Sequence, residues 1–418
     1  MEKKYLLFAL CSFMTMSFVS CDNDDDPKPE IPTESSTTGV YFLNAGKLGS
    51  NNSTLDYYDP ETKNLTTKVF ATENGRGLGD TANDMLIYGS KMYIAVNKSA
   101  TIEVTDLSGK SLKTISPKDE SNVPQQPRML TAAGGNVYVT LFDGHLACID
   151  TTSMEIVKKV KVGPNPEGVC ELNGKLYVAN SGGYNLVQDS TLSVVDMNTF
   201  EEVEKIVVTI NPKTIQKDDK GNLYVLSLGN WGNIGNELQR LNVATGDREV
   251  IEANSQIVST LCNDKIYIYS AEQENYIVTG YDFKVYDIEK GKIEEKSFIA
   301  DGTKVDNTYC MSSDPVTGNV YIGTSDYTST GDMFIFSAEG KLINQVALSG
   351  LNPGWGLFLD NSKVRVFFNE IYCLSIIDFL GCGLFTTQKV PFRKLPLFRH
   401  HPLRPGVYRA SFRWLYGC

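Results

Sequence analysis

The sequence predicts an all-β fold, a seven-bladed β-propeller whose first blade is closed by a C-terminal strand. A turn residue, usually aspartate, recurs with a period of about 45 residues, which is in the range of propeller blades. An apolar strand with a central tyrosine precedes each turn in the same order, so two independent markers repeat together. The turn residues are Asp59, Asp106, Asp150, Asp196, Asn242, Asp287 and Ser337, and the tyrosines are Tyr41, Tyr93, Tyr138, Tyr177, Tyr224, Tyr267 and Tyr321.

The composition permits a large packed core. The chain has 418 residues, of which 41% are hydrophobic and 10% aromatic, and its formal net charge is -11. This negative charge argues against a nucleic-acid partner. We give the acidic balance no other functional weight, because a solvated surface explains it.

Residues 1–20 are expected to form a lipoprotein signal peptide. Lys3 and Lys4 precede an apolar run, residues 5–19, that is too short to span a bilayer comfortably. The run ends in Phe-Val-Ser-Cys, which resembles a bacterial lipobox, with phenylalanine where leucine is usual. Cys21 would be the lipidated residue of the mature chain. The alternative is a plain secretory signal followed by an unrelated cysteine.

Residues 21–38 are predicted to be a tether rich in acidic residues, proline, serine and threonine, with too few apolar residues to fold. Its acidic run, Asp22–Asp26, resembles the signal that directs lipoproteins to the cell surface in some gut Gram-negative bacteria. Under the enterobacterial rule, Asp22 would instead retain the protein on the inner membrane. We expect the first outcome: a protein anchored in the outer membrane by its lipid alone and facing the exterior.

Each repeat reads as four antiparallel strands. The clearest repeat gives strands at 168–172, 175–180, 191–196 and 203–208. The second of them is apolar on both faces, as a strand between two neighbouring sheets must be. The fourth is charged, which protects an outer edge from aggregation. A β-helix would have shorter coils, and a sandwich would not repeat.

The propeller is expected to occupy residues 39–361. Its first repeat supplies second, third and fourth strands at 40–43, 55–58 and 65–70, but no first strand precedes them. The missing strand is predicted at 356–359, after the last complete repeat. Residues 362–418 then lose the pattern: one segment, 363–367, resembles an eighth second strand, and the remainder is rich in Arg, Pro, Phe and Cys. This tail is either a small accessory module or, as we favour, a disordered or non-native extension.

Chemical motifs are sparse within the predicted propeller. His145 is its only histidine, and neither a phosphate loop nor a metal-binding cysteine pair appears. We therefore predict no cofactor and no metal, and we expect its four cysteines to be small buried hydrophobes. Four charged residues start successive first strands near the axis: Asp84, Arg128, Glu167 and Lys213. They could hold an ion or a polar ligand, or form salt bridges between blades, which we favour.

The loops carry the stronger functional signal. Connections between second and third strands are expected to be long in five repeats, at 45–52, 181–190, 228–236, 271–281 and 325–331, and short in the repeats of Tyr93 and Tyr138. The long loops combine aromatic residues with Asn and Ser, a mixture typical of binding surfaces. Their aromatic residues are Tyr184, Trp231, Tyr276, Tyr281 and Tyr327, and Trp355 joins the same face. We predict ligand contacts at Asn51, Tyr184, Trp231, Tyr276, Trp355 and Arg128.

Two segments carry a family resemblance. Residues 39–59 resemble the opening of YncE-like surface lipoproteins, and residues 166–180 are similar to the YVTN-type propeller repeat. The likeness extends from Gly39 to about Asp360 and is specific for fold rather than function. Among such lipoproteins, those of the BtuG type capture vitamin B12 at the cell surface for an outer-membrane transporter. No short ligand motif can be transferred from that family to this chain.

We therefore expect a non-enzymatic lipoprotein that captures a small-molecule ligand on the loop face of the propeller, with a corrinoid (vitamin B12, cobalamin) as the leading ligand and an outer-membrane transporter as partner. A corrin is a broad apolar plate fringed with amides, which suits an aromatic and Asn-rich face. One alternative is a glycan- or protein-binding propeller. Another is a metal-dependent, lactonase-like hydrolase, although Arg128 and Lys213 interrupt the axial carboxylates that such an enzyme would need.

Overall fold

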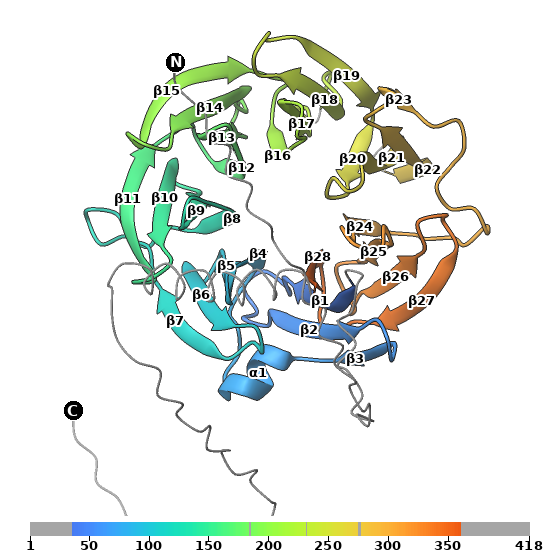
Figure 1. Ribbon diagram of the computed structural model, residues 1–418, viewed down its shortest axis with the longest axis horizontal. Helices are drawn as coiled ribbons and strands as arrows, with labels where there is room; N and C mark the ends of the chain where they lie inside the picture. Colours follow the sequence, from blue (N-terminus) through green and yellow to red (C-terminus); the bar gives the residue numbers. More distant parts are fainter. Residues whose placement is uncertain (1–35, 184, 231, 275–276, 361–418) are drawn as a thin grey trace, which may run out of the picture. The chain divides into compact units, whose positions relative to one another are not determined.

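Seven four-stranded antiparallel sheets form a closed ring in the computed structural model (Figure 1). The structure describes residues 36–360 except 184, 231 and 275–276. These residues confirm the predicted all-β, seven-bladed propeller. The expected signal peptide, Cys21, nearly all of the tether and the tail from 362 onward lie outside the described residues, as do the candidate site residues Tyr184, Trp231 and Tyr276.

The blades follow one another around the ring, each with its first strand nearest the axis (Figure 1). Blade 1 contains β28 (Pro353–Asp360), β1 (Thr37–Asn44), β2 (Thr54–Asp59) and β3 (Asn64–Thr66). Blade 2 contains β4 (Ala82–Tyr88), β5 (Lys91–Val96), β6 (Thr101–Asp106) and β7 (Ser111–Ile115). Blade 3 contains β8 (Pro127–Ala133), β9 (Asn136–Leu141), β10 (His145–Asp150) and β11 (Glu155–Lys161). Blade 4 contains β12 (Pro166–Leu172), β13 (Lys175–Asn180), β14 (Thr191–Asp196) and β15 (Glu201–Val207).

The remaining blades keep the same order. Blade 5 contains β16 (Pro212–Lys217), β17 (Asn222–Ser227), β18 (Glu237–Asn242) and β19 (Arg248–Ala253). Blade 6 contains β20 (Ser255–Val258), β21 (Lys265–Glu274), β22 (Ile277–Asp287) and β23 (Lys292–Ile293). Blade 7 contains β24 (Thr308–Ser313), β25 (Val320–Thr324), β26 (Asp332–Phe336) and β27 (Leu342–Ala347).

Blade 1 joins the two ends of the propeller. β28 pairs antiparallel with β1, with Val40 opposite Phe358 and Tyr41 opposite Leu357. The predicted closing strand, 356–359, lies inside β28 and is thus confirmed. A hydrogen bond from the Thr37 hydroxyl to the Asp314 carboxylate, 2.7 Å long, also ties β1 to blade 7.

The buried strands explain the repeated tyrosine. In β13 the four residues Leu176 to Ala179 are at most 4% exposed, because the strand has neighbours on both faces. The marker tyrosines occupy the same place in every blade and are all buried. The outer strands β11 and β15 remain mostly exposed, in agreement with their charge.

The repeated aspartate closes the turn between the third and fourth strands. Asp196 Oδ1 accepts hydrogen bonds from the backbone N–H groups of Asn198 and Thr199 at 2.9 and 3.0 Å. Asp150 does the same two and three residues ahead. The proposed role of this position is confirmed, because a short carboxylate can satisfy N–H groups that the turn leaves unpaired.

Two expected elements are wrong. The fourth strand predicted at 65–70 ends at Thr66, and a short helix, α1 (Val69–Asn74), follows it, because Lys68 adopts a left-handed φ of 55° and Phe70 turns into the core. A loop was predicted at 271–281, but its described residues 271–274 and 277–281 belong to β21 and β22, which pair as far as Glu274 and Ile277. Within the described residues no helix is long and apolar enough to span a membrane.

Candidate functional site

The backbone has a recurring irregular conformation at the start of the first strands, where one side chain of each blade lies near the propeller axis. In six blades the residue before the strand has a positive φ, and five of these six residues are asparagine, which tolerates this conformation. The residues are Thr81, Asn165, Asn211, Asn254, Asn307 and Asn352. In four blades proline begins the strand, where the missing N–H costs no ladder bond.

A β-bulge follows in all seven first strands, between the first strand residue and the regular ladder. Bulges redirect side chains and strengthen local twist. The bulged positions form what we call the axial ring: Asn83, Arg128, Glu167, Lys213, Gln256, Tyr309 and, in blade 1, Gly354 with Trp355. The carbonyl groups of the residues before these strands accept hydrogen bonds from the loops after the second strands. The backbone N–H of Leu228 donates to the Asn211 carbonyl, and that of Ser325 donates to the Asn307 carbonyl. The loops after the second strands therefore lie on the same face as the connections between blades.

The charged part of the axial ring is a three-membered cluster shared by three blades. Arg128 donates two hydrogen bonds of 2.8 Å, from Nε and Nη2, to the Glu167 carboxylate. Lys213 Nζ lies 2.7 Å from Glu167 Oε1. The side chain of Glu167 is only 5% exposed, whereas that of Lys213 is 32% exposed. The expected salt bridges between blades are therefore confirmed at Glu167.

Electrostatics in this cluster favour ionised Glu167. Burial alone would raise the pKa of Glu167, but Lys213 and Arg128 together lower it below its ordinary value. Burial lowers the pKa of Lys213, and Glu167 offsets only part of this effect. Two cations thus share one carboxylate, and the Asn83 amide, which donates to the Arg128 carbonyl at 2.8 Å, adds no charge.

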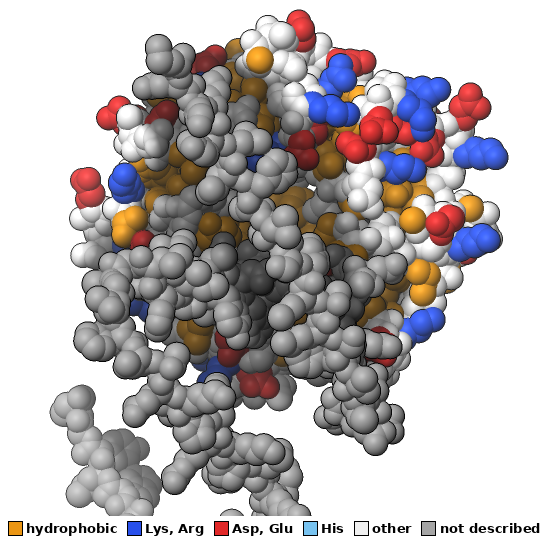
Figure 2. Space-filling model, viewed as in Figure 1, with side chains coloured by type: hydrophobic (Ala, Val, Ile, Leu, Met, Phe, Trp, Pro, Cys, Tyr) orange, Lys and Arg blue, Asp and Glu red, His pale blue; other side chains and the backbone are white. Residues whose placement is uncertain are grey.

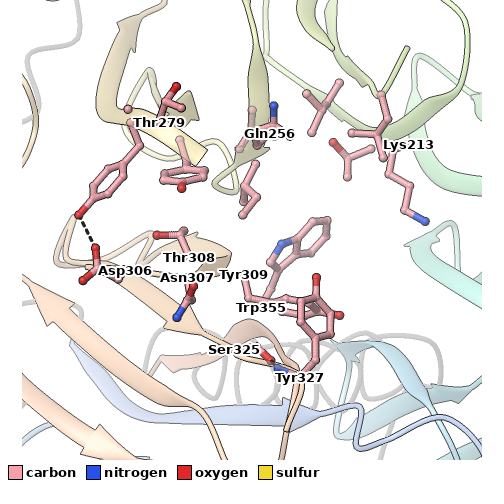
Figure 3. A pocket seen from close by; sticks show the side chains of 18 residues that line it. Lys213, Gln256, Thr279, Asp306, Asn307, Thr308, Tyr309, Ser325, Tyr327 and Trp355 are labelled. Atoms are coloured by element: carbon pink, nitrogen blue, oxygen red, sulfur yellow. Dashed lines mark hydrogen bonds between the residues drawn. The ribbon is translucent and has the colours of Figure 1, made fainter. Parts of the chain in front are cut away.

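A cavity of about 1040 Å³ opens beside the axis (Figure 3). Its described walls come from blades 5, 6 and 7 and from Trp355 of blade 1, and none of the described residues of blades 2, 3 and 4 lines it. Polar groups around it include Lys213, Gln256, Asp306, Asn307 and Ser325, and the side chains of Lys213 and Asp306 lie on opposite sides (Figure 3).

Aromatic side chains occupy much of the cavity wall between these polar groups: Tyr269, Tyr281, Tyr309, Tyr327 and Trp355. Tyr309 and Tyr327 meet edge to face, with ring centroids 5.6 Å apart. Burial raises the pKa of Tyr309 to about 12, so its hydroxyl stays protonated. The Tyr281 hydroxyl donates to Asp306 at 3.0 Å.

Tyr327 stands at the rim in a conformation unusual for its type. Its φ is 61° and its side chain is 65% exposed. The Ser325 hydroxyl accepts its N–H at 3.0 Å, and Asp326 accepts two further backbone N–H groups. Left-handed backbone at a bulky residue is costly and is found more often at functional sites.

A second cavity of about 330 Å³ lies on the axis and shares Thr214, Val258 and Trp355 with the first, so Trp355 borders both. Asp84 lines this second cavity. Burial raises the pKa of Asp84 to about 7, although its Oδ2 accepts the Leu130 N–H at 2.8 Å. In blade 2 the bulged residue is Asn83, so Asp84 lies one residue beyond the ring position.

The structure brings together only part of the predicted site. Trp355 lines the cavity, and so do Tyr281 and Tyr327 from the predicted loops. Asn51 lies in the exposed loop between β1 and β2, with a positive φ, and does not line the cavity. Arg128 belongs to the axial ring but is engaged by Glu167. Its contact with a ligand stays a prediction.

Sequence reasoning missed Tyr269 and Tyr309. Both lie in strands, where alternation suggests only core positions. A three-residue pattern in the sequence could have revealed Tyr309. An asparagine precedes the strand, the next residue begins it, and the third residue belongs to the axial ring, so that Asn307-Thr308-Tyr309 matches Asn211-Pro212-Lys213.

The cysteines and the possible metal ligands outside the axial ring were also candidates for a functional site. Cys148, Cys170, Cys262 and Cys310 are buried free thiols, as expected. In the part of the chain that the structure describes, no group of three or more His, Cys, Asp or Glu side chains is arranged to hold a metal ion.

The chain shares its sequence pattern with one protein family. The family described as a domain of unknown function, DUF5074, matches residues 38–353. This chain belongs to the DUF5074 family. No curated protein shows significant sequence similarity to it.

Solved structures that resemble this DUF5074 protein share its fold at low identity. A quinonprotein alcohol dehydrogenase-like protein from Bacteroides thetaiotaomicron is 19% identical with a TM-score of 0.54, covering 78% of this chain and 79% of that one. A putative 6-phosphogluconolactonase from Bacteroides uniformis is 10% identical with a TM-score of 0.54, covering 77% and 100%. Hydrazine synthase from Kuenenia stuttgartiensis is 18% identical with a TM-score of 0.51, covering 62% and 77%. These similarities concern the propeller fold alone.

Proposed function

We propose that this DUF5074 protein is a non-enzymatic, ligand-capturing lipoprotein of the YncE-like, BtuG type, anchored through Cys21 to the outer membrane and facing the exterior. Its ligand would be a corrinoid that it passes to an outer-membrane transporter. The observation that carries the proposal is the aromatic cavity of about 1040 Å³ beside the axis. Typical sites for drug-sized ligands measure roughly 300–1,000 Å³, so this cavity suits a ligand at or above the upper end of that range.

The chemistry of the walls fits a broad plate with a polar fringe. Tyr309, Tyr327 and Trp355 offer aromatic faces and edges for the plate. Asn307 and Ser325 lie near them and can exchange hydrogen bonds with peripheral amides (Figure 3). Aromatic side chains supply contact area at low entropic cost, and short polar side chains adapt to the fringe.

The asymmetry of the ring also supports capture rather than catalysis. The axial carboxylate Glu167 already has two cationic partners, and Asp306 accepts the Tyr281 hydroxyl. A hydrolase acting in this cavity would need carboxylates free to bind a metal ion or to accept a proton from water, and the remaining axial carboxylate, Asp84, lines the second cavity instead. Acidic and basic side chains are interspersed on the outer rim of the blades that contain β18 to β27, while hydrophobic side chains lie nearer the centre (Figure 2).

Titration calorimetry tests the proposal directly. Full-length Cys21→Ser protein, which cannot be lipidated, should bind cyanocobalamin with a stoichiometry of one. Absence of both heat and a thermal shift would remove the corrinoid assignment. A glycan array on the same preparation would then separate sugar binding from protein binding.

A further inference from the structure

We propose that Lys213 is an anion-binding group of the axial cavity, so that the ligand carries a carboxylate or phosphate group directed toward the axis. The inference rests on the proposed function, because it assigns the chemical class of one end of the captured ligand. Its basis is the axial ring, which is divided into a charged part on blades 3 to 5 and an aromatic part on blades 7 and 1.

The charge balance of the ring is the first step. Glu167 accepts from Arg128 and from Lys213 within 2.8 Å, so one carboxylate serves two cations. In a buried setting an incompletely neutralised cation attracts an anion far more strongly than it would in water. The next carboxylate along the axis, Asp84, lines the second cavity rather than the first, and it interacts electrostatically with Arg128 rather than with Lys213.

The exposure of the three groups decides which cation faces the ligand. The side chains of Glu167 and Arg128 are 5% and 15% exposed, and Arg128 is held by two hydrogen bonds. Lys213 contacts Glu167 and lines the cavity from β16, on the side opposite Asp306, with its ammonium group pointing away from the aromatic side chains (Figure 3). An ammonium has three donors, so at least one can turn to a ligand oxygen while the Glu167 contact persists. Glu167 and Arg128 are therefore positioning residues for Lys213.

The side of the cavity that lies across from Lys213 carries a carboxylate. Asp306 lies across from Lys213 (Figure 3) and accepts a hydrogen bond from Tyr281. Trp355 and Tyr309 lie between these two charges in the cavity lining. The cavity thus recognises a molecule with an anionic group at the axis, a flat apolar body, and hydrogen-bond donors at the outer end. In cobalamin the phosphodiester of the nucleotide loop is such an anionic group, and cobinamide lacks it.

The test uses ionic quenchers of Trp355 fluorescence, so that it does not depend on the corrinoid. In full-length protein carrying Trp231→Phe and Trp414→Phe, Trp355 is the remaining tryptophan. At constant ionic strength, the ratio of iodide to caesium quenching should be at least about twofold higher for Trp355 than for free N-acetyltryptophanamide, because a local cation concentrates anions within a Debye length and adds to the intrinsic strength of iodide as a quencher. Lys213→Gln should remove this preference and Lys213→Arg should retain it. The control is Lys217→Gln, which removes a lysine that lines the second cavity and is paired with Glu171.

The outcomes separate the inference from the proposed function. Unchanged iodide preference in folded Lys213→Gln protein would overturn the anion site, whether or not cobalamin binds. If cobalamin binds, Lys213→Gln should weaken its binding about tenfold and leave cobinamide binding unchanged. Equal loss for both ligands would assign Lys213 a structural role and refute the inference. Circular dichroism confirms folding, which the remaining Arg128–Glu167 pair should maintain.

Discussion

Replacing Glu167 by glutamine should destabilise the propeller by about 3 kcal/mol at neutral pH. Removing one partner of a buried ion pair typically costs roughly 3–5 kcal/mol, because the other charge stays buried and unpaired. Here the substitution leaves Arg128 and Lys213 as adjacent like charges, with Arg128 only 15% exposed. We expect the lower end of the range, since Lys213 can turn into the cavity.

Urea titration followed by circular dichroism measures this effect as a shift of the midpoint at unchanged slope. The matched control is Glu171→Gln on the same strand, β12, whose partner Lys217 is 39% exposed. Loss of such an exposed pair should cost at most about 1 kcal/mol. The pKa of Glu167 is lowered, so its contribution exists above the ordinary glutamate pKa and disappears as the pH falls through the lowered value. The difference between wild type and Glu167→Gln should therefore shrink in acid. Equal effects of the two substitutions would refute the central role of Glu167.

Three further predictions concern other parts of the chain. Asp84→Asn should stabilise the protein by roughly 2 kcal/mol at pH 8 and by less at pH 5, as measured by urea titration. Folding raises the pKa of Asp84 to about 7, so the wild-type protein loses stability as the pH rises toward that value. A larger gain at pH 5 than at pH 8 would contradict this explanation. Ending the chain before Gly354 should remove the pairing of β28 with β1 and lower the melting temperature sharply, whereas ending it after Asn361 should be tolerated; equal melting temperatures would refute the closure. Cys21→Ser should release the protein from the membrane, and alanine at Asp24–Asp26 should abolish protease accessibility on intact cells; unchanged exposure of the triple variant would dismiss the surface-export signal.

The fold could be predicted because each blade repeats the same physical constraints. Buried second strands need apolar residues on both faces, and the turns need a short hydrogen-bond acceptor such as Asp196. The misplaced elements have local causes. Residues 271–274 begin a polar stretch that resembles a loop in composition, yet they extend β21 by pairing with residues 277–281 of β22. Lys68 breaks the fourth strand of blade 1 through a left-handed conformation that no composition rule reveals.

The site was harder to predict, because it depends on departures from regular alternation. Arg128, Glu167 and Lys213 were placed near the axis from their position at strand starts, and the structure joins them in one cluster. Tyr309 resembles a core residue until the bulge at its position is known. The cavity also depends on which blades face one another across the ring, and short-range patterns contain no such information.

The central claim is that the aromatic cavity beside the axis holds the ligand, and Trp355→Ala tests it most directly. Trp355 borders both cavities, and it lines the first of them together with Lys213 of the charged cluster. An aromatic hot spot accounts for about 2 kcal/mol or more of binding energy, so calorimetry should show cyanocobalamin binding at least about tenfold weaker in this variant. Trp355 also packs against the core cluster that contains Val40 and Phe42, so the melting temperature should fall as well, and circular dichroism establishes that the variant is folded. Asp196→Ala, which opens a turn on the far face, should lower the melting temperature and leave affinity intact. Wild-type affinity in folded Trp355→Ala protein would contradict the account.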